Sequence, residues 1–183
     1  MRVFARDGFH GARVGDIAEE AGVAHGLLYH YFRSKEEVLE TIFRSAWEEL
    51  VSETERIERS ELPLADQLRR FASVFLGSWR GDPDLVRVLI REIARSPEVG
   101  KRIAEIGSVF SALTRMIESA RARGEVRADV DPRLAAFIFY GALEEILTGW
   151  VLDQLPSAEA DVRRAVDTVV DVVAAGLEPP ALG

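Results

Sequence analysis

The sequence contains no cysteine, which excludes disulfide bonds, thiolate metal sites and a cysteine nucleophile. All three histidines lie within the first 35 residues, so the rest of the chain cannot supply the histidine of a Glu-x-x-His di-iron site. The longest apolar run, residues 134–143, is much shorter than the about 20 residues that a membrane-spanning helix needs. The first residues show no signal-peptide pattern. Because the lack of cysteine also fits a reducing compartment, we expect a cytoplasmic protein with no membrane partner.

Positive charge is in the minority, since Lys and Arg total 23 against 31 for Asp and Glu, which gives a net charge of −8. This balance argues against a uniformly basic nucleic-acid coat or a membrane-surface protein. Residues 1–35 nevertheless hold five basic and four acidic residues, whereas the remainder holds 18 and 27. The sequence thus predicts a near-neutral head joined to a larger acidic body, with chance clustering in a short window as the alternative.

Signals for helix starts and ends follow one another along the whole chain. Prolines stand directly after Asp82, Ser96 and Asp131, where they suit the first turn of a helix. Ser34 and Glu37 have the spacing of a capping box, and glycines suited to helix ends occur at Gly8, Gly22, Gly81 and Gly124. No stretch alternates as a strand would. We predict an all-α fold of about nine helices, at residues 1–7, 14–21, 25–32, 35–60, 64–80, 83–95, 98–122, 132–154 and 158–177.

Residues 14–32 carry the strongest pattern. A short helix that includes Ile17 and the small Ala18 ends at Gly22, which permits a tight turn before a second short helix. This layout is the helix-turn-helix, whose second helix enters the major groove of DNA. Leu28 and Phe32 are four residues apart and are expected to face the core of the head, so the other side chains face double-stranded operator DNA. The predicted DNA-binding residues are Arg13, His25, Gly26, Leu27, Tyr29, His30, Tyr31 and Lys35, with Lys35 placed to meet a phosphate.

The head also resembles a known family. The segments VFARDGF (residues 3–9), IAEEAGV (17–23) and LYHYFRSKEEVL (28–39) are similar to the N-terminal domain of the tetracycline repressor (TetR) family. The resemblance implies a helix-turn-helix DNA-binding domain at residues 1–43 and a helical ligand-binding and dimerisation domain at residues 44–183. It implies a homodimeric, ligand-responsive transcription regulator, usually a repressor, in which Tyr29, His30, Tyr31 and Lys35 face DNA.

The head departs from the family pattern in several places. Leu27 replaces a residue that is usually Thr, Ser or Ala, Ala24 replaces a common capping serine, and Gly15 stands where a polar residue often contacts DNA. Met1 falls inside what is normally a longer first helix with a basic arm before it. A start further upstream, omitted residues and a reduced DNA footprint are the open explanations. The alternative function is a helical ligand-binding or scaffolding protein whose truncated head no longer binds DNA.

The body offers candidates for an effector site. Apolar side chains on four predicted helices could line a cavity for a small apolar effector: Phe71, Phe75, Trp79, Leu89, Ile93, Phe110, Leu113, Phe137 and Tyr140. Ordinary core packing is the alternative for each of them. Residues 139–152 resemble the matching helix of fatty-acid-degradation repressors, which implies an acyl-CoA effector. Arg87, Arg91 and Arg95 form a stripe that could meet its phosphates, unless this stripe is a solvated helix face.

The last two predicted helices carry more apolar surface than one packing face needs. In a two-fold dimer they would form a four-helix bundle, and the predicted seam is Phe139, Leu143, Leu147, Trp150, Val162, Val166, Val169 and Val173. The alternative is that both helices complete the core of one subunit.

The sequence has no H-E-x-x-H, G-x-S-x-G or phosphate-binding glycine motif, so we expect no enzymatic activity, cofactor or metal.

Overall fold

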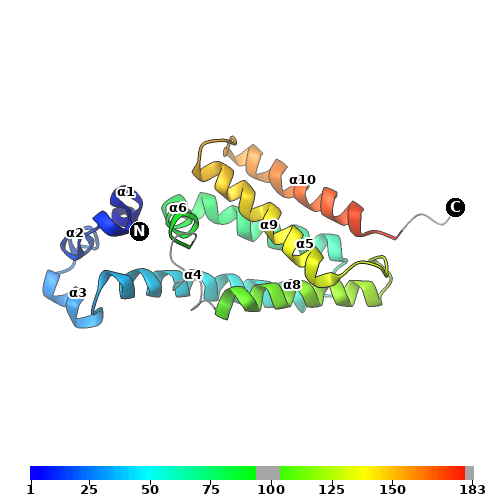
Figure 1. Ribbon diagram of the computed structural model, residues 1–183, viewed down its shortest axis with the longest axis horizontal. Helices are drawn as coiled ribbons and strands as arrows, with labels where there is room; N and C mark the ends of the chain where they lie inside the picture. Colours follow the sequence, from blue (N-terminus) through cyan, green and yellow to red (C-terminus); the bar gives the residue numbers. More distant parts are fainter. Residues whose placement is uncertain (94–103, 180–183) are drawn as a thin grey trace.

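The structure is a computed structural model that describes residues 1–93 and 104–179. The described residues form nine α-helices and no strand, which confirms the all-α prediction (Figure 1). The helices are α1 (Arg2–Gly11), α2 (Val14–Glu20), α3 (His25–Tyr31), α4 (Lys35–Glu58), α5 (Leu64–Gly81), α6 (Pro83–Ile93), α8 (Ala104–Ala122), α9 (Pro132–Val151) and α10 (Glu159–Leu177). The predicted helix start at Ser96 lies outside the described residues.

Helices α1, α2 and α3 form the head at one end of the molecule (Figure 1). Two glycines with positive φ shape it. Gly8 (φ 69°) interrupts α1 where the sequence predicted a helix end, and Gly22 (φ 67°) makes the tight turn between α2 and α3. The turn is closed by hydrogen bonds from the backbone N–H groups of Gly22 and Val23 to the carbonyls of Glu19 and Ala18. Because residues other than glycine rarely adopt a positive φ, the turn depends on glycine at position 22.

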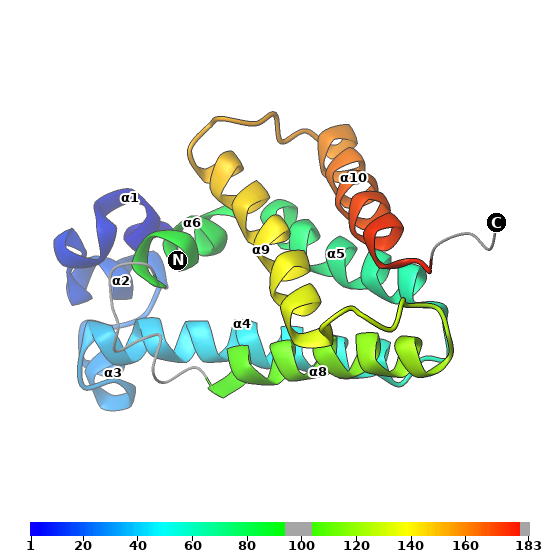
Figure 2. The ribbon, with the colours of Figure 1, turned by 45° about the vertical axis from the view of Figure 1, so that its right-hand side comes forward.

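The body consists of α5, α6, α8, α9, α10 and most of α4. Helices α4 and α8 run side by side, α5 packs along α10, and α9 crosses between them with contacts to α5, α6, α8 and α10 (Figures 1 and 2). Capping residues start two of these helices as predicted. The Asp131 carboxylate accepts hydrogen bonds from the backbone N–H groups of Arg133 and Leu134, and Asp82 accepts one from Leu85. Helix α5 ends at Gly81, close to the predicted position, with Gly81 as its last residue and Asp82 as the C-cap.

Helix α9 is, among the described residues, the one helix long and apolar enough to cross a membrane by length and composition alone. Half of its most apolar stretch is buried inside the body, where Phe139 and Leu143 are fully enclosed. Because α9 is apolar on most sides and packs against four neighbouring helices, we interpret it as a core helix of the body.

Two helices connect the head with the body. Helix α4 continues without a break across the predicted division at residue 43, so both parts share it. Helix α6 packs against α1 on one side and against α9 and α5 on the other. Val88 on α6 is buried in the head's apolar cluster together with Val3, Phe4 and Phe43, whereas Val86 belongs to the body's core. Any movement of α6 therefore reaches the head directly.

Candidate DNA-binding and effector sites

Helix α3 presents nearly all of its side chains to solvent. Tyr31 is 68% exposed and Tyr29 50% exposed, whereas Leu28 is buried in the head as predicted. The rings of His25 and Tyr29 meet edge to face at 5.1 Å, and so do those of His30 and Tyr31. These pairs restrict the rotamers of side chains that can donate hydrogen bonds to phosphates or base edges. The surface of α3 therefore has the chemistry of a recognition helix.

Two exposed arginines flank this surface. Arg13 precedes α2, and Arg33 follows α3. Neither forms an ion pair within the described residues, so both guanidinium groups are available for phosphates. Arg13 was among the predicted DNA-binding residues. Arg33 was not, although its charge next to the predicted recognition helix was a signal that could have found it.

Lys35 has a different role from the predicted phosphate contact. Its Nζ donates hydrogen bonds to the carbonyl oxygens of Phe9 (2.8 Å), His10 (3.0 Å) and Ala12 (3.2 Å), and it lies 4.8 Å from the centre of the Phe9 ring. An ammonium group has three N–H donors, and all three are used here. Lys35 therefore ties the end of α1 to the start of α4, and we no longer assign it to DNA.

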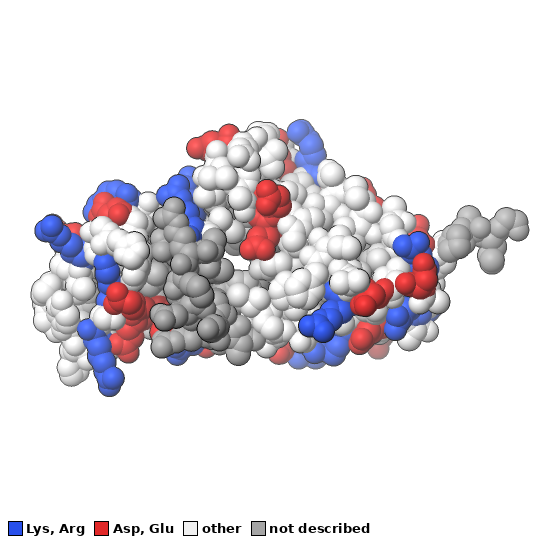
Figure 3. Space-filling view, viewed as in Figure 1, with Lys and Arg blue, Asp and Glu red and all other residues white. Residues whose placement is uncertain are grey.

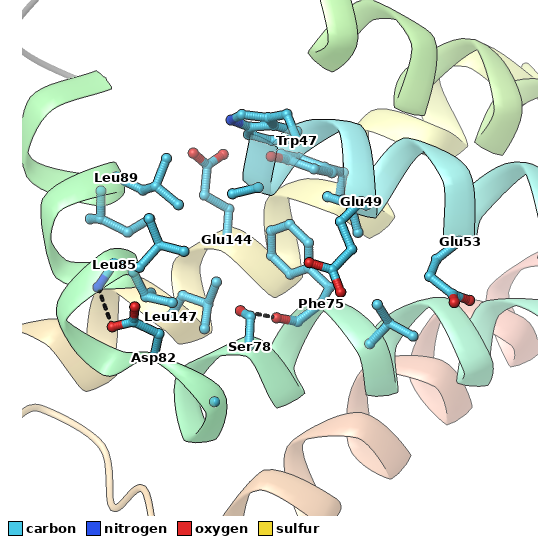
Figure 4. A pocket seen from close by; sticks show the side chains of 17 residues that line it. Trp47, Glu49, Glu53, Phe75, Ser78, Asp82, Leu85, Leu89, Glu144 and Leu147 are labelled. Carbon is cyan, nitrogen blue, oxygen red and sulfur yellow. Dashed lines mark hydrogen bonds between the residues drawn. The ribbon is translucent and has the colours of Figure 1, made fainter. Parts of the chain in front are cut away.

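A cavity of about 390 Å³ opens between α4, α5, α6 and α9 (Figure 4). Of the predicted effector residues, Phe75, Leu89 and Tyr140 line it. The others with described side chains do not: Phe71, Trp79 and Leu113 are packed in the core, and Phe137 stacks on Phe110 with 4.2 Å between ring centres. The side chain of Ile93 lies outside the described part of the chain. For Phe71, Trp79 and Leu113 the structure supports the alternative interpretation, ordinary core packing, whereas Phe137 is 50% exposed.

Several lining residues were not predicted. The apolar ones are Ala46, Trp47, Leu50, Val74, Leu85, Val86, Ile90 and Leu147. Trp47 and Leu50 lie three residues apart on α4, a spacing that places them on one helix face. That periodicity was present in the sequence, but the prediction assigned no residue of this helix to the cavity. Helix α4 is therefore both the link to the head and a wall of the cavity.

The charged residues that line the cavity are all acidic. Among its 17 lining residues are Glu49, Glu53, Asp82 and Glu144, and there is no Lys, Arg or His. Partial burial, with a smaller contribution from Glu145, raises the pKa of Glu144 above its usual value. Burial also raises the pKa of the Tyr140 phenol. The indole Nε1 of Trp47 is buried and has no hydrogen-bond partner within the described part of the chain. The cavity thus combines apolar walls with a few polar groups that have no partner.

The arginine stripe of α6 faces away from the cavity. Arg87 pairs with Asp84 at 3.0 Å and lies 5.1 Å from the centre of the Trp79 ring. Arg87 and Arg91 line a shallow hollow against α1, together with Arg2 and Arg6. Leu85 and Leu89, which line the cavity, occupy another side of the same helix. The structure therefore places Arg87 and Arg91 between head and body rather than beside the effector, and Arg95 lies outside the described residues.

A second group of arginines lies next to the cavity. Arg56, Arg69 and Arg70 line an open groove between α4 and α5, and this groove shares Glu53 and Val74 with the cavity wall. Arg56 is paired with Glu53, and Arg69 with Asp167 and Asp171, whereas Arg70 has no ion pair within the described residues. An apolar cavity thus continues into a groove that carries guanidinium groups.

Both parts of the chain match known sequence families. Residues 1–42 match the family described as "Bacterial regulatory proteins, tetR family", and residues 62–169 match "Tetracyclin repressor-like, C-terminal domain". The chain belongs to the tetracycline repressor family. It is accordingly a ligand-responsive, DNA-binding transcription regulator, and TetR regulators bind operator DNA as homodimers.

Individual TetR-family relatives cover almost the whole chain. The fatty acid metabolism regulator protein of Bacillus subtilis is 26% identical over 97% of this chain and 91% of its own length. The crystal structure of FadR from Bacillus subtilis in complex with stearoyl-CoA superposes with a TM-score of 0.85 at 24% identity, covering 97% of this chain and 95% of that one. FadR from Bacillus halodurans gives 0.82 at 25% identity with the same coverage of both chains. These relatives are transcription regulators rather than enzymes.

The dimer seam predicted for this TetR-family protein needs correction. Phe139, Leu143, Leu147, Trp150, Val162, Val166 and Val169 are buried within the single chain, and Val173 packs against the same core. They therefore complete the core of one subunit, which was the alternative left open. The apolar side chains that remain exposed on α9 and α10 include Leu134 (62%), Ile138 (66%) and Val172 (68%). In Figure 3, which has the orientation of Figure 1, the surface over α9 is largely uncharged.

Proposed function

We propose that this protein is a cytoplasmic repressor that a long-chain fatty acyl-CoA releases from its operator. The observation that carries the proposal is the position of the cavity. Its walls include α4 and α6, the two helices that also contribute Phe43 and Val88 to the head's apolar cluster. An effector in this cavity therefore contacts the same helices that hold the recognition helix in place.

The cavity and the neighbouring groove fit the two parts of an acyl-CoA. Ligand pockets are typically about 300–1,000 Å³ and mostly apolar, and a cavity of about 390 Å³ suits an alkyl chain. Phosphate groups are well matched by arginine, which binds them through two parallel hydrogen bonds. We assign the phosphate-bearing part to Arg56 and Arg70 in the adjoining groove. The stearoyl-CoA bound by the FadR of Bacillus subtilis supports this effector class.

The operator would be contacted by α3 of each subunit. In helix-turn-helix dimers the two recognition helices enter successive major grooves about 34–36 Å apart. We propose that Tyr29, His30 and Tyr31 reach base edges and sugar-phosphate groups, while Arg13 and Arg33 neutralise phosphates. The dimer would be formed through the exposed apolar face of α9 and α10 that contains Leu134, Ile138 and Val172.

Release would follow from a change in the position of α6. Leu85 and Leu89 line the cavity and also pack against the head's apolar cluster. An acyl chain that displaces these side chains moves α6 against α1 and changes the separation of the two heads. The change in operator affinity can be no larger than the difference in effector affinity between the two arrangements.

A gel shift with the DNA upstream of the protein's own gene tests this function. We expect specific binding by the wild type, its loss in a Tyr29→Ala variant, and release of the DNA by palmitoyl-CoA. Binding that palmitoyl-CoA does not alter would leave a DNA-binding regulator with a different effector. If the full-length protein bound no DNA, the alternative of a ligand-binding or scaffolding protein would replace the repressor.

A further inference from the structure

The candidate recognition helix α3 lacks the residue types that read bases through their charged or amide side chains. Arg and Lys pair with guanine, Asn and Gln pair with adenine, and Asp and Glu accept a hydrogen bond from cytosine. Residues 25–31 contain none of these six types. Their polar side chains are two histidines and two tyrosines, which offer single hydrogen bonds to phosphates or base edges. Discrimination between bases by α3 therefore needs a further kind of contact.

Helix α3 instead exposes large apolar and aromatic side chains. Among the described residues, Leu27 (45% exposed), Tyr29 (50%) and Tyr31 (68%) all lie on this helix of seven residues. In Figure 1 α3 lies at the end of the molecule opposite the C-terminus. A single exposed leucine needs no explanation, but three large side chains together on one short helix indicate a surface that a partner covers.

The part of α3 that points away from the head carries almost no side chain. Leu28 is buried, and a spacing of two residues turns a helical side chain by about 200°, so Gly26 and His30 point outward. A methyl group at Gly26 would meet no other segment of the described chain within 4 Å, so the fold itself does not require glycine there. Glycine at this point lets the helix backbone approach the base edges closely.

Leu27 and His25 lie on opposite flanks of α3, because they too are two residues apart. The Nε2 atom of His25 lies 3.5 Å from the place that a Cβ of Gly15 on α2 would occupy, and its ring meets that of Tyr29 edge to face at 5.1 Å. This flank therefore presents polar groups in a restricted position. The flank of Leu27 presents a branched alkyl group and, one turn further on, the ring of Tyr31.

We infer that Leu27 recognises a thymine in each half of the operator by packing against the C5-methyl group of the base. This methyl group is the apolar group that base pairs display in the major groove, and apolar side chains contact it. The close approach that Gly26 permits brings the Leu27 side chain within reach of the methyl group. The inference rests on the proposed placement of α3 in the major groove and names the base chemistry that one residue of α3 recognises.

Replacement of thymine by deoxyuridine tests the inference, because deoxyuridine keeps every hydrogen-bonding group of thymine and lacks only the methyl group. The operator is located by footprinting in the DNA upstream of the protein's own gene, and each thymine is then replaced in both half-sites together. Fluorescence anisotropy measures the affinity. We expect one pair of positions at which the wild type loses roughly fourfold for each methyl group, and so about fifteenfold for the pair. Losses below about threefold at every position would overturn the inference.

A double-mutant cycle assigns the methyl contact to Leu27. Leu27→Ala should bind the thymine and deoxyuridine operators within about twofold of each other. Leu155→Ala is the matched control, because Leu155 has almost the same exposure (46%) and lies in the loop between α9 and α10. This control should keep the full wild-type preference for thymine, and circular dichroism checks that both variants are folded. If Leu27→Ala keeps that preference, another side chain or the shape of the DNA accounts for it, and the assignment is wrong.

The same operator separates this inference from the proposed function. If palmitoyl-CoA releases the wild type from the operator but no thymine methyl group matters, the repressor stands and the role of Leu27 is wrong. If a thymine methyl group matters through Leu27 but palmitoyl-CoA does not release the DNA, the role of Leu27 stands and the effector is wrong. If the protein binds no upstream DNA specifically, both proposals fail.

Discussion

Phe43 and Trp47 lie one turn apart on α4, yet they belong to different apolar cores. Phe43 is buried with Val3 and Phe4 in the head, whereas Trp47 is buried in the body and lines the cavity. A single helical turn therefore separates the head, which carries the candidate recognition helix, from the candidate effector cavity. Because this turn is continuous helix, with no flexible joint, we expect a displacement at Trp47 to reach the head.

Substitution at Val88 is expected to weaken the coupling between effector and operator. Val88→Ala leaves a gap between α6 and the head, and we expect a loss of about 1–2 kcal/mol in stability together with a smaller effect of palmitoyl-CoA on DNA binding. Val126→Ala, equally buried but in the body's core, serves as the control for lost stability. Fluorescence anisotropy with labelled operator DNA measures the response. If both variants respond like the wild type, α6 does not carry the signal through Val88.

Lys35→Met should destabilise the head. The substitution removes three hydrogen bonds that join α4 to the end of α1, and we expect a loss of about 1–3 kcal/mol in the free energy of unfolding. Thermal and urea denaturation followed by circular dichroism measures this loss. A variant of normal stability whose DNA affinity depends less steeply on salt, by a slope of about one, would show that Lys35 contacts a phosphate after all.

The exposed face of α9 is expected to hold the dimer together. Ile138→Asp introduces a charge into this apolar face and should convert the dimer to a monomer in native mass spectrometry, with little change in helix content. Phe139→Ala, at the next position on the buried side, should instead lower stability by about 3–5 kcal/mol. A dimer that survives Ile138→Asp would place the seam elsewhere.

The Glu144 carboxyl should make the protein less stable as pH rises. Its pKa is raised in the folded state, so between the unfolded value of 4.5 and that raised value the folded chain binds more protons than the unfolded chain. Stability is therefore complete below pH 4.5 and is lost as pH increases through the folded pKa. We expect Glu144→Gln to raise the melting temperature at pH 8 and not at pH 4. Glu48→Gln, on the exposed side of α4, should show no such difference between the two pH values.

Local signals in the sequence were enough to predict the helices and the head. Ser34 caps α4 through the backbone N–H of Glu37, Asp131 caps α9, and Gly22 turns the chain between α2 and α3. These features depend on a few neighbouring residues, so they can be recognised without knowing the tertiary structure. The burial of Leu28 followed from helical spacing in the same way.

The residues that line the cavity and those that form the dimer seam are determined by packing between segments far apart in the sequence. Local sequence patterns therefore could not predict them. The apolar stripe of α9 was recognised, but periodicity could not say which of its sides meets the chain's own core and which meets a second subunit. Phe139 faces inward and Ile138 outward, although both are large and apolar. Likewise, Phe71 and Phe75 lie on one stripe of α5, and only Phe75 reaches the cavity. Lys35 was misassigned because its three acceptors come from a segment about 25 residues away.

Some residues of the cavity wall also contact the head and others do not, and this difference affects how effector preference can change during evolution or engineering. Leu85 and Leu89 on α6 touch both the ligand space and the head, so substitutions there alter ligand choice and DNA binding together. Phe75 and Tyr140, on α5 and α9, touch the ligand space and the body's core only. Libraries built at Phe75 and Tyr140 should therefore yield biosensors with new ligand responses and an unchanged operator, whereas libraries at Leu85 and Leu89 should yield mostly defective repressors.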